Sequence, residues 1–302
     1  MKMKKSAINW IALVGKIKSD DDKVTHIPTF IDDGPNKGQP QFSLVKSNVE
    51  FESGKIEFYV TFKDQNSKCQ LILSHGEPSE TFVGLNFGST AFGISNFSGG
   101  KWEYIAATGD LSSLQINKRM KIVILIQGSK IDLYVNEVKV CSGLAQIVRA
   151  QLAFYIIGTK EVLVENFRID KSAPKAFVVM QFSPEYNELY EEVIKPNCKK
   201  FGLEVIRADD MYTNSLILED ITKSIREASV VIADITVDNP NVFYEVGYAH
   251  AINKPTILLS DKKRAKLPFD VSGFRTLFHE NSIGGKRAVE ENLSKYLQNL
   301  NV

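Results

Sequence analysis

The sequence predicts two domains of different fold class, an all-β sandwich followed by an α/β domain built on a parallel sheet. Two patterns lead to this prediction. Up to about Asp170, short runs of alternating apolar and polar residues are separated by Gly, Asn, Asp and Ser, which is typical of β-strands joined by turns. Beyond Asp170, buried strand runs alternate with amphipathic helix runs. We therefore expect a sandwich over residues 1–170, a linker over 171–175 and an α/β domain over 176–302, as a length of 302 residues allows.

The sandwich half is predicted from the period of its apolar residues. Ile56, Phe58, Val60 and Phe62 alternate with residues of the opposite face, so one face of this strand should be buried and the other solvated. Gly-Ser at 128–129 and Asn-Glu at 136–137 are expected to turn the chain between strands. About a dozen strands at this spacing favour a sandwich. The further predicted strands are residues 70–75, 82–87, 92–97, 102–107, 121–127, 130–135, 138–141, 150–157 and 162–169.

Two stretches of this half, Phe51 to Glu57 and Val164 to Ile169, resemble the concanavalin A-like (laminin G-like) jelly roll. Many members of that group bind carbohydrate, and exposed rings at Trp102 or Tyr104 could stack on a sugar. The alternative is that these rings belong to the core or that the sandwich recognises protein, and we favour this alternative because a cytoplasmic protein meets few glycans. No acidic cluster in this half has the spacing of a calcium loop.

The α/β half is predicted from strand and helix runs in alternation. They indicate a parallel, doubly wound sheet with right-handed crossovers and a flavodoxin-like strand order. The expected strands are residues 176–182, 203–207, 230–233, a run ending at Ser260, and an edge strand at 273–279. The expected helices are residues 184–201 and 215–228, a helix beginning at 239–240, and a terminal helix at 286–300.

The stretch from Ser229 to Ser260 is expected to carry the functional site. Its apolar strand run stops at Asp234, and Asn239 followed by proline is a helix-start signal. The helix that follows is largely apolar, yet Glu245 falls in its second turn. A carboxylate on a buried helix is costly unless it has partners or a task, and ligands of open α/β sheets bind beyond the carboxyl ends of the strands. We therefore favour a functional role for Glu245 over simple attraction to the helix dipole.

The same stretch resembles the nucleoside 2-deoxyribosyltransferase-like proteins, which are close in fold to TIR domains. The resemblance rests on Asp234-Ile-Thr, on the run from Asn239 through Tyr-Glu245-Val-Gly to Ala251, and on Lys254-Pro. It covers roughly Lys175 to the C-terminus. It implies that Glu245 works on the bond between a ribose and its base.

The resemblance also implies which other residues form the site. Met180, Gln181 and Phe182 match a first-strand loop that lines the nucleoside pocket in relatives, many of which have proline in place of Gln181. One acidic residue among Asp209, Asp210 and Asp220 is implied to contact the base, although a cap or solvated turn is the better reading for any single one. Asp234 has two open interpretations: it positions the loop or the ligand, or it only bonds Thr236 or the helix start.

For three further sites we favour the structural interpretation. Asn239, with Asn241 beside it, touches the ribose or only caps the helix, and we favour the cap. We favour a core position for His250, and a loop instead of a phosphate site for Gly284-Gly285-Lys286.

These expectations combine into an enzyme that cleaves an N-glycosidic bond, with Glu245 stabilising or trapping the sugar cation. NAD and a nucleoside or nucleotide remain alternative substrates: nicotinamide leaves as a neutral molecule, whereas a neutral base needs a proton from an acid such as Asp209, Asp210 or Asp220. No cofactor or metal is expected, and NAD enters only as a substrate. The competing hypothesis is a non-catalytic nucleotide-binding signalling module. The resemblance further suggests a homo-oligomer and, by analogy, a regulated effector of bacterial defence.

Composition excludes several classes. The net charge is +1 without a dense basic run, which argues against a nucleic-acid binder. Three widely spaced cysteines, Cys69, Cys141 and Cys198, match no metal spacing and fit a reducing, cytoplasmic location. The apolar part of the first residues is short and is followed by a charge run, so we expect neither a signal peptide nor a membrane span.

Overall fold

The computed structural model describes residues 8–20, 22–208, 217–264 and 266–300. The chain divides into two compact units, one of residues 1–126 with 130–172 and the other of residues 127–129 with 173–302. Strand β16 ends at Lys171 and strand β17 begins at Lys175, so only residues 172–174 separate the two strands. The predicted linker of residues 171–175 is therefore shorter than expected at both ends.

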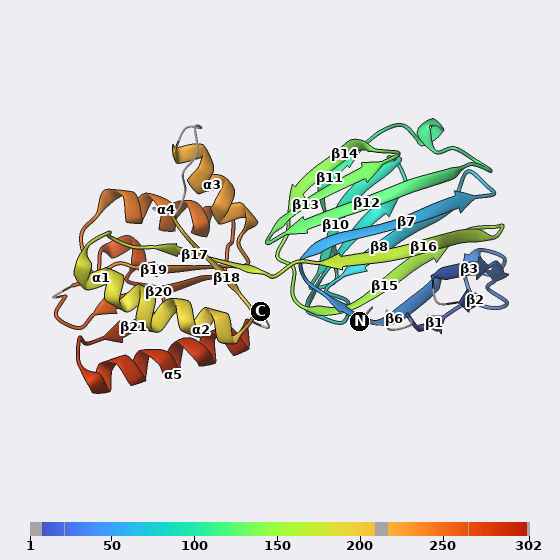
Figure 1. The fold of residues 1–302 in the computed structure, drawn as a ribbon. Helices are drawn as coiled ribbons and strands as arrows, with labels where there is room; N and C mark the ends of the chain where they lie inside the picture. Colours follow the sequence, from blue (N-terminus) through green and yellow to red (C-terminus); the bar gives the residue numbers. More distant parts are fainter. Residues whose placement is uncertain (1–7, 21, 209–216, 265, 301–302) are drawn as a thin grey trace, which may run out of the picture. The chain divides into compact units, whose positions relative to one another are not determined.

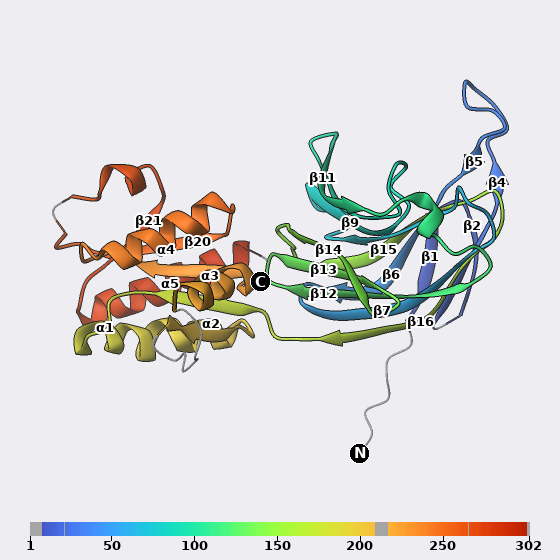
Figure 2. The ribbon, with the colours of Figure 1, turned by 90° about the horizontal axis from the view of Figure 1, so that it is seen from above.

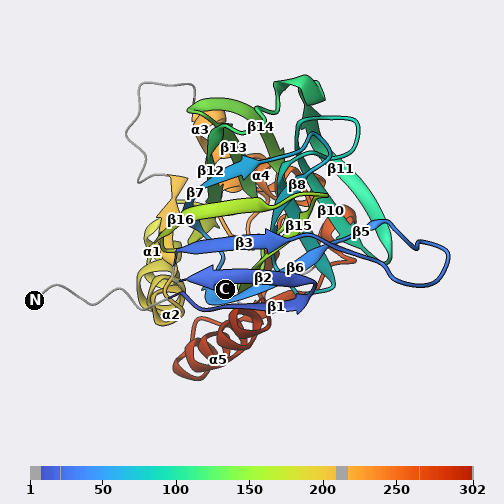
Figure 3. The same ribbon diagram turned by 90° about the vertical axis from the view of Figure 1, so that its right-hand side faces the viewer.

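The first unit is a sandwich of two seven-stranded antiparallel sheets, which confirms the predicted β-sandwich (Figures 1 and 2). The first sheet has the order β1 (Trp10–Val14), β6 (Ser43–Phe51), β15 (Ala150–Ile157), β8 (Lys68–Leu73), β9 (Ser79–Leu85), β10 (Phe92–Ser98), β11 (Lys101–Thr108). The second has the order β14 (Val138–Leu144), β13 (Lys130–Val135), β12 (Arg119–Gln127), β7 (Gly54–Phe62), β16 (Val162–Lys171), β3 (Lys23–Ile27), β2 (Lys16–Asp20). Figure 3 shows β16, β3 and β2 side by side at the edge of this sheet. The short strands β4 (Thr29–Phe30) and β5 (Pro40–Gln41) pair separately.

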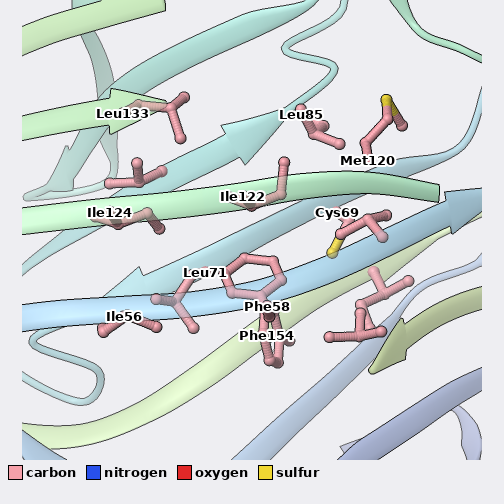
Figure 4. Close-up of a cluster of buried hydrophobic side chains, with 14 of the residues drawn as sticks. Ile56, Phe58, Cys69, Leu71, Leu85, Met120, Ile122, Ile124, Leu133 and Phe154 are labelled. Atoms are coloured by element: carbon pink, nitrogen blue, oxygen red, sulfur yellow. The ribbon is translucent and has the colours of Figure 1, made fainter. Parts of the chain in front are cut away.

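The core of the sandwich lies between the inner faces of the two sheets. Along β7 the side chains alternate as predicted, and Ile56, Phe58 and Val60 are buried. In the neighbouring strand β12, Ile124 and Ile122 stand opposite Ile56 and Phe58 in register (Figure 4). Such directly opposed apolar pairs stabilise an antiparallel sheet, because each side chain removes its neighbour from water.

The second unit is built on a five-stranded sheet in which all strands run parallel, with the order β18 (Glu204–Arg207), β17 (Lys175–Val179), β19 (Val230–Asp234), β20 (Thr256–Asp261), β21 (Thr276–His279). Alternate residues of its strands face opposite layers of helices. One layer packs around Val178 and Ile232 and contains α5 (Ile283–Asn299), with α1 (Pro184–Leu189), η2 (Tyr190–Ile194) and α2 (Lys195–Lys200). The other packs around Val179 and Val231 and contains α3 (Ile217–Glu227) and α4 (Pro240–Ala251) (Figure 1). Among the described helices, none has the length and apolar character that crossing a bilayer requires.

Several element boundaries differ from the sequence prediction, including the edge strand expected at 273–279, which begins at Thr276, and three differences in the α/β unit have a local cause or consequence. The strand expected at 176–182 ends at Val179, and residues 180–183 form the loop that leads into α1. The expected helix at 184–201 is interrupted by the π-helical turn η2, where the Lys195 N–H donates to the Tyr190 carbonyl; Pro196, which has no N–H, follows directly.

The third difference concerns the terminal helix. Helix α5 begins at Ile283 instead of Lys286, since the Ser282 side chain caps it by accepting a hydrogen bond from the Gly285 N–H at 3.1 Å. Gly284 and Gly285 therefore lie in the first turn of a helix, and the prediction of a loop at these residues is wrong.

Candidate functional site

The carboxyl ends of the five parallel strands place polar side chains along one edge of the sheet. Arg207 is the last residue of β18, Asp234 of β19, Asp261 of β20 and His279 of β21. All four side chains are buried, although each is polar or charged. In open parallel sheets this edge is where ligands bind, because the loops that follow the strands open there.

Asp234, Asp261 and His279 belong to one hydrogen-bonded group. One carboxylate oxygen of Asp234 lies 2.8 Å from His279 Nε2, and the other accepts the Thr236 N–H at 3.0 Å. The Thr236 hydroxyl in turn accepts the Asp261 N–H at 2.9 Å. The group ties the ends of three strands to the loop before α4, so the structural bond from Asp234 to Thr236 is present.

Replacing Asp234 with alanine is expected to lower the free energy of unfolding by about 2–4 kcal/mol, because His279 and the Thr236 N–H would be left buried without an acceptor. Urea denaturation measures this loss. The matched control is Glu291→Ala on α5, since Glu291 and its partner Arg287 are both exposed, and a cost below about 1 kcal/mol is expected there. Equal losses in the two variants would contradict the structural role of Asp234.

Glu245 lies on helix α4, whose start is fixed by Asn239. The Asn239 side chain accepts the Asn241 N–H at 3.0 Å, which is the capping role favoured from the sequence. Val242 and Val246, one turn apart, pack against the sheet, and Glu245 lies on the same stripe with 8% of its surface exposed. The helix therefore carries the carboxyl group into an apolar layer.

Burial has a large effect on this carboxyl group. It raises the pKa of Glu245 from 4.5 to about 7, since a charge in an apolar layer loses its hydration. Among the residues that the structure describes, no side chain or backbone group pairs with the Glu245 carboxylate. A carboxyl group that is poised near neutrality can act as a proton donor, as a proton acceptor or as a negative charge for a cationic ligand.

The remaining predicted residues lie in the loop after β17 and in the first turns of α3 and α4. Met180 is buried in the core layer of α1 and α5, and Gln181 is half-buried. Phe182 is 50% exposed, and its ring lies 5.3 Å from the Arg207 guanidinium. Asp220 lies partly exposed in the first turn of α3, and Asn241 is exposed in the first turn of α4. Asp209 and Asp210 lie outside the described residues.

His250 does not occupy the core position expected from the sequence. Its ring is only half-buried and stacks on Phe274, with the ring centroids 4.0 Å apart. Partial burial lowers the pKa of His250. The His250 side chain therefore lies near the surface against Phe274, and not in the core layer between α4 and the sheet.

The sequence did not single out Arg207, Asp261 or His279. The Arg207 guanidinium lies 4.2 Å from the centre of the Tyr190 ring and donates to the Asn187 side chain at 2.8 Å. A charged residue directly after an apolar strand run was the available signal for Arg207 and Asp261. His279 had no local signal, because its partner Asp234 is 45 residues away.

A cavity of about 330 Å³ opens beside this edge, on the side of the sheet covered by α1 and α5. Burial and the carboxylates of Asp234, Glu185 and Asp261 raise the pKa of Tyr186, which lines it. Glu245 is on α4, in the opposite layer. No hydrogen bond or ion pair within the described part of the chain joins Glu245 to the Asp234 group, and no three His, Cys, Asp or Glu side chains there are grouped to hold a metal ion.

No protein-family model and no curated protein sequence matches the chain. Among solved structures, a carbohydrate-binding module of family 66 from Bacillus subtilis is 13% identical, covers 55% of this chain and 98% of its own, and has a TM-score of 0.44. A β-glucanase from Bacillus licheniformis is 12% identical, with 57% and 95% covered and a TM-score of 0.38. A galectin from Caenorhabditis elegans is 15% identical, with 40% and 84% covered and a TM-score of 0.33. Similarity at this level carries no information on activity or ligand.

Proposed function

We propose that the α/β unit is an N-glycosidase that acts on NAD or on a nucleoside or nucleotide, with Glu245 as its catalytic carboxylate. The observation that carries the proposal is the burial of Glu245 on the helix that follows strand β19, without a partner among the described residues. This burial raises its pKa to about 7. Counted along the chain, the strand order of the sheet is 2-1-3-4-5, which supports a flavodoxin-like unit with its ligand beyond the carboxyl ends. Strongly perturbed carboxyl groups of this kind concentrate at functional sites.

The proposed reaction breaks the bond between the anomeric carbon and the base nitrogen. Positive charge develops on the sugar as the base leaves, and a carboxylate next to the anomeric carbon stabilises that charge or forms a bond to the carbon. Approach of a positively charged group favours the ionised form of Glu245, so the ligand itself offsets the effect of burial. Water, or a second base in a transfer reaction, then takes the sugar.

The two substrate classes place different demands on the site. Nicotinamide leaves NAD as a neutral molecule, so Glu245 alone is sufficient for that chemistry. A neutral base must be protonated as it leaves, which assigns an acid role to Asp209, Asp210 or Asp220. In either case we assign Phe182, with its exposed ring, and Asn239 and Asn241, at the start of α4, to substrate binding.

The second candidate is a nucleotide-binding module that does not turn its ligand over. It uses the same edge of the sheet, with the sandwich sensing a ligand or a protein. The burial of Glu245 favours the enzyme, because a binding site without chemistry gains little from a buried carboxyl group that no described residue pairs with. The proposal further includes a homo-oligomer, a cytoplasmic location and, by analogy with relatives, a regulated role in defence.

Analysis of recovered ligands tests the proposal. The purified chain is incubated with NAD, with deoxynucleosides and with deoxynucleotides, and each mixture is separated by chromatography. The enzyme releases free base from one of these classes, and added adenine yields a new nucleoside if the reaction is a transfer. A binding module returns every ligand intact. Intact recovery at equal protein and ligand concentrations would contradict the proposed function.

A further inference from the structure

The outer face of the first sandwich sheet carries a row of residues that are unusual for a solvent-facing surface. Across β15, β8, β9 and β10, Tyr155 pairs with Gln70, Gln70 with Gly84, and Gly84 with Gly93. Their neighbours along each strand, including Leu71 and Val83 in the core, face the opposite way, so this row lies on the outer face. Gly84 and Gly93 stand side by side in this row, and the Phe87 ring lies over Gly93, where a Cβ atom would come within 2.7 Å of it.

Side chains on this face line a hollow of about 360 Å³ that is open to solvent on one side and has the size of a small-ligand site. Its aromatic lining comes from Phe87, Trp102, Tyr104 and Tyr155. Trp102 is 56% exposed and Tyr104 is 58% exposed, so the reading of these two rings as core residues is wrong.

Both exposed rings are held in place from below. The Trp102 ring packs against Phe82 at 4.7 Å and Phe97 at 4.9 Å between ring centroids, and the Tyr104 hydroxyl donates to the Phe87 carbonyl at 2.9 Å. An exposed ring that is already immobilised loses little conformational entropy when a ligand stacks on it.

The polar lining is left with hydrogen-bonding capacity that the protein does not use. Ser95 is 2% exposed, and its hydroxyl has no hydrogen-bond partner in the described part of the chain. The Gln70 amide donates to the Asn86 carbonyl at 2.9 Å, which leaves its oxygen as an acceptor. A buried hydroxyl without a partner costs stability, and such groups in native structures call for an explanation such as a bound molecule.

Charge narrows the class of ligand. Lys68 lines the cavity, none of the residues lining it is acidic, and no carboxylate among the described residues pairs with the Lys68 ammonium group. Aromatic faces suit the C–H face of a sugar ring, and hydroxyl and amide groups suit its hydroxyls. An ammonium group without a partner adds a preference for a negative charge on the ligand.

We propose that this outer-face pocket binds an acidic saccharide, whose ring lies against Trp102 and Tyr104, whose hydroxyls reach Ser95 and Gln70, and whose carboxylate pairs with Lys68. The site lies wholly within the sandwich unit and is independent of the function proposed for Glu245. It replaces the preference for a core or protein-binding role drawn from the sequence, because Trp102 and Tyr104 are exposed and the Ser95 hydroxyl beside them has no partner among the described residues.

Two matched pairs of probes test the charge preference on the full chain. Tetragalacturonate is compared with its carboxyl-reduced form, and sialyllactose with lactose. Binding is followed by calorimetry and by tryptophan fluorescence, to which Trp102 is the exposed contributor because the chain's other tryptophan, Trp10, is buried. At least one acidic probe should bind roughly tenfold more tightly than its neutral partner and change the fluorescence.

Substitutions assign the binding to the pocket. Lys68→Gln should bring the affinity of the acidic probe down to that of its neutral partner, and Trp102→Ala should abolish binding of both. Matched controls are Lys18→Gln on β2 and Phe30→Ala on β4, both exposed and outside the pocket, which should leave affinity unchanged. Equal affinity within each pair, an unaffected Lys68→Gln variant, no saturation by either acidic probe up to about 10 mM, or binding of GMP in place of any saccharide would overturn the proposal.

Discussion

The variant Glu245→Gln is expected to be more stable than the wild type by up to about 3 kcal/mol near pH 8, and almost equally stable near pH 4.5. In the folded protein burial raises the pKa of Glu245 to about 7, whereas the unfolded chain has its ordinary value of 4.5. Between these values unfolding releases a proton, so the stability of the wild type falls as the pH rises. Above about pH 7 the folded carboxyl group is also ionised and the difference levels off. Glutamine carries no charge at any pH and avoids this loss.

Urea denaturation of both proteins at several values between about pH 4.5 and 8 measures the difference. The matched control is Glu219→Gln in the first turn of α3, because Glu219 is exposed and its replacement should change stability by less than about 0.5 kcal/mol at every pH. A stability difference for Glu245→Gln that does not grow with pH would contradict the account of Glu245 as a carboxyl group whose pKa is raised by burial.

Local patterns in the sequence predicted the elements whose structure depends on local chemistry. The alternation from Ile56 to Phe62 gave a strand with one buried face, and Asn239 with Pro240 placed the start of α4 at the correct residue. Glu245 was identified because its neighbours along the helix are apolar, which predicts burial directly. These features need only the period of the residues and the chemistry of a helix cap.

Features that depend on pairing between distant strands were not predictable in this way. The Asp234 group forms only because β19, β20 and β21 align in parallel register, and a sequence period contains no information on that alignment. The sugar pocket of the sandwich has the same origin. Trp102 and Tyr104 could be named from the sequence because they are aromatic. Ser95 and Gln70 lie beside them only through the register of four strands, which the sequence does not show. The end of β17 and the start of α5 are set by loop and cap contacts, and the sequence around each of them is compatible with several boundary positions.

Glu245→Gln is also expected to lower turnover by a factor of about 10³ or more while changing substrate affinity by less than about fivefold. Glutamine keeps the shape and hydrogen-bonding capacity of the side chain but has no charge, and it forms no glycosyl ester. Charge on the sugar exists only as the base departs, so the loss falls on the transition state and spares the bound substrate. A binding module would show the reverse, with no turnover to lose and a modest change in affinity.

The most direct measurement is therefore the initial rate of free-base release at saturating substrate for the wild type, Glu245→Gln and Glu219→Gln, with dissociation constants measured by calorimetry on the same preparations. The proposed function predicts release by the wild type and by Glu219→Gln at similar rates, and a loss of about three orders of magnitude or more in Glu245→Gln with little change in affinity. Release by Glu245→Gln within about tenfold of the wild-type rate would remove Glu245 from the chemistry, and the absence of release from every protein would leave the α/β unit as a binding module.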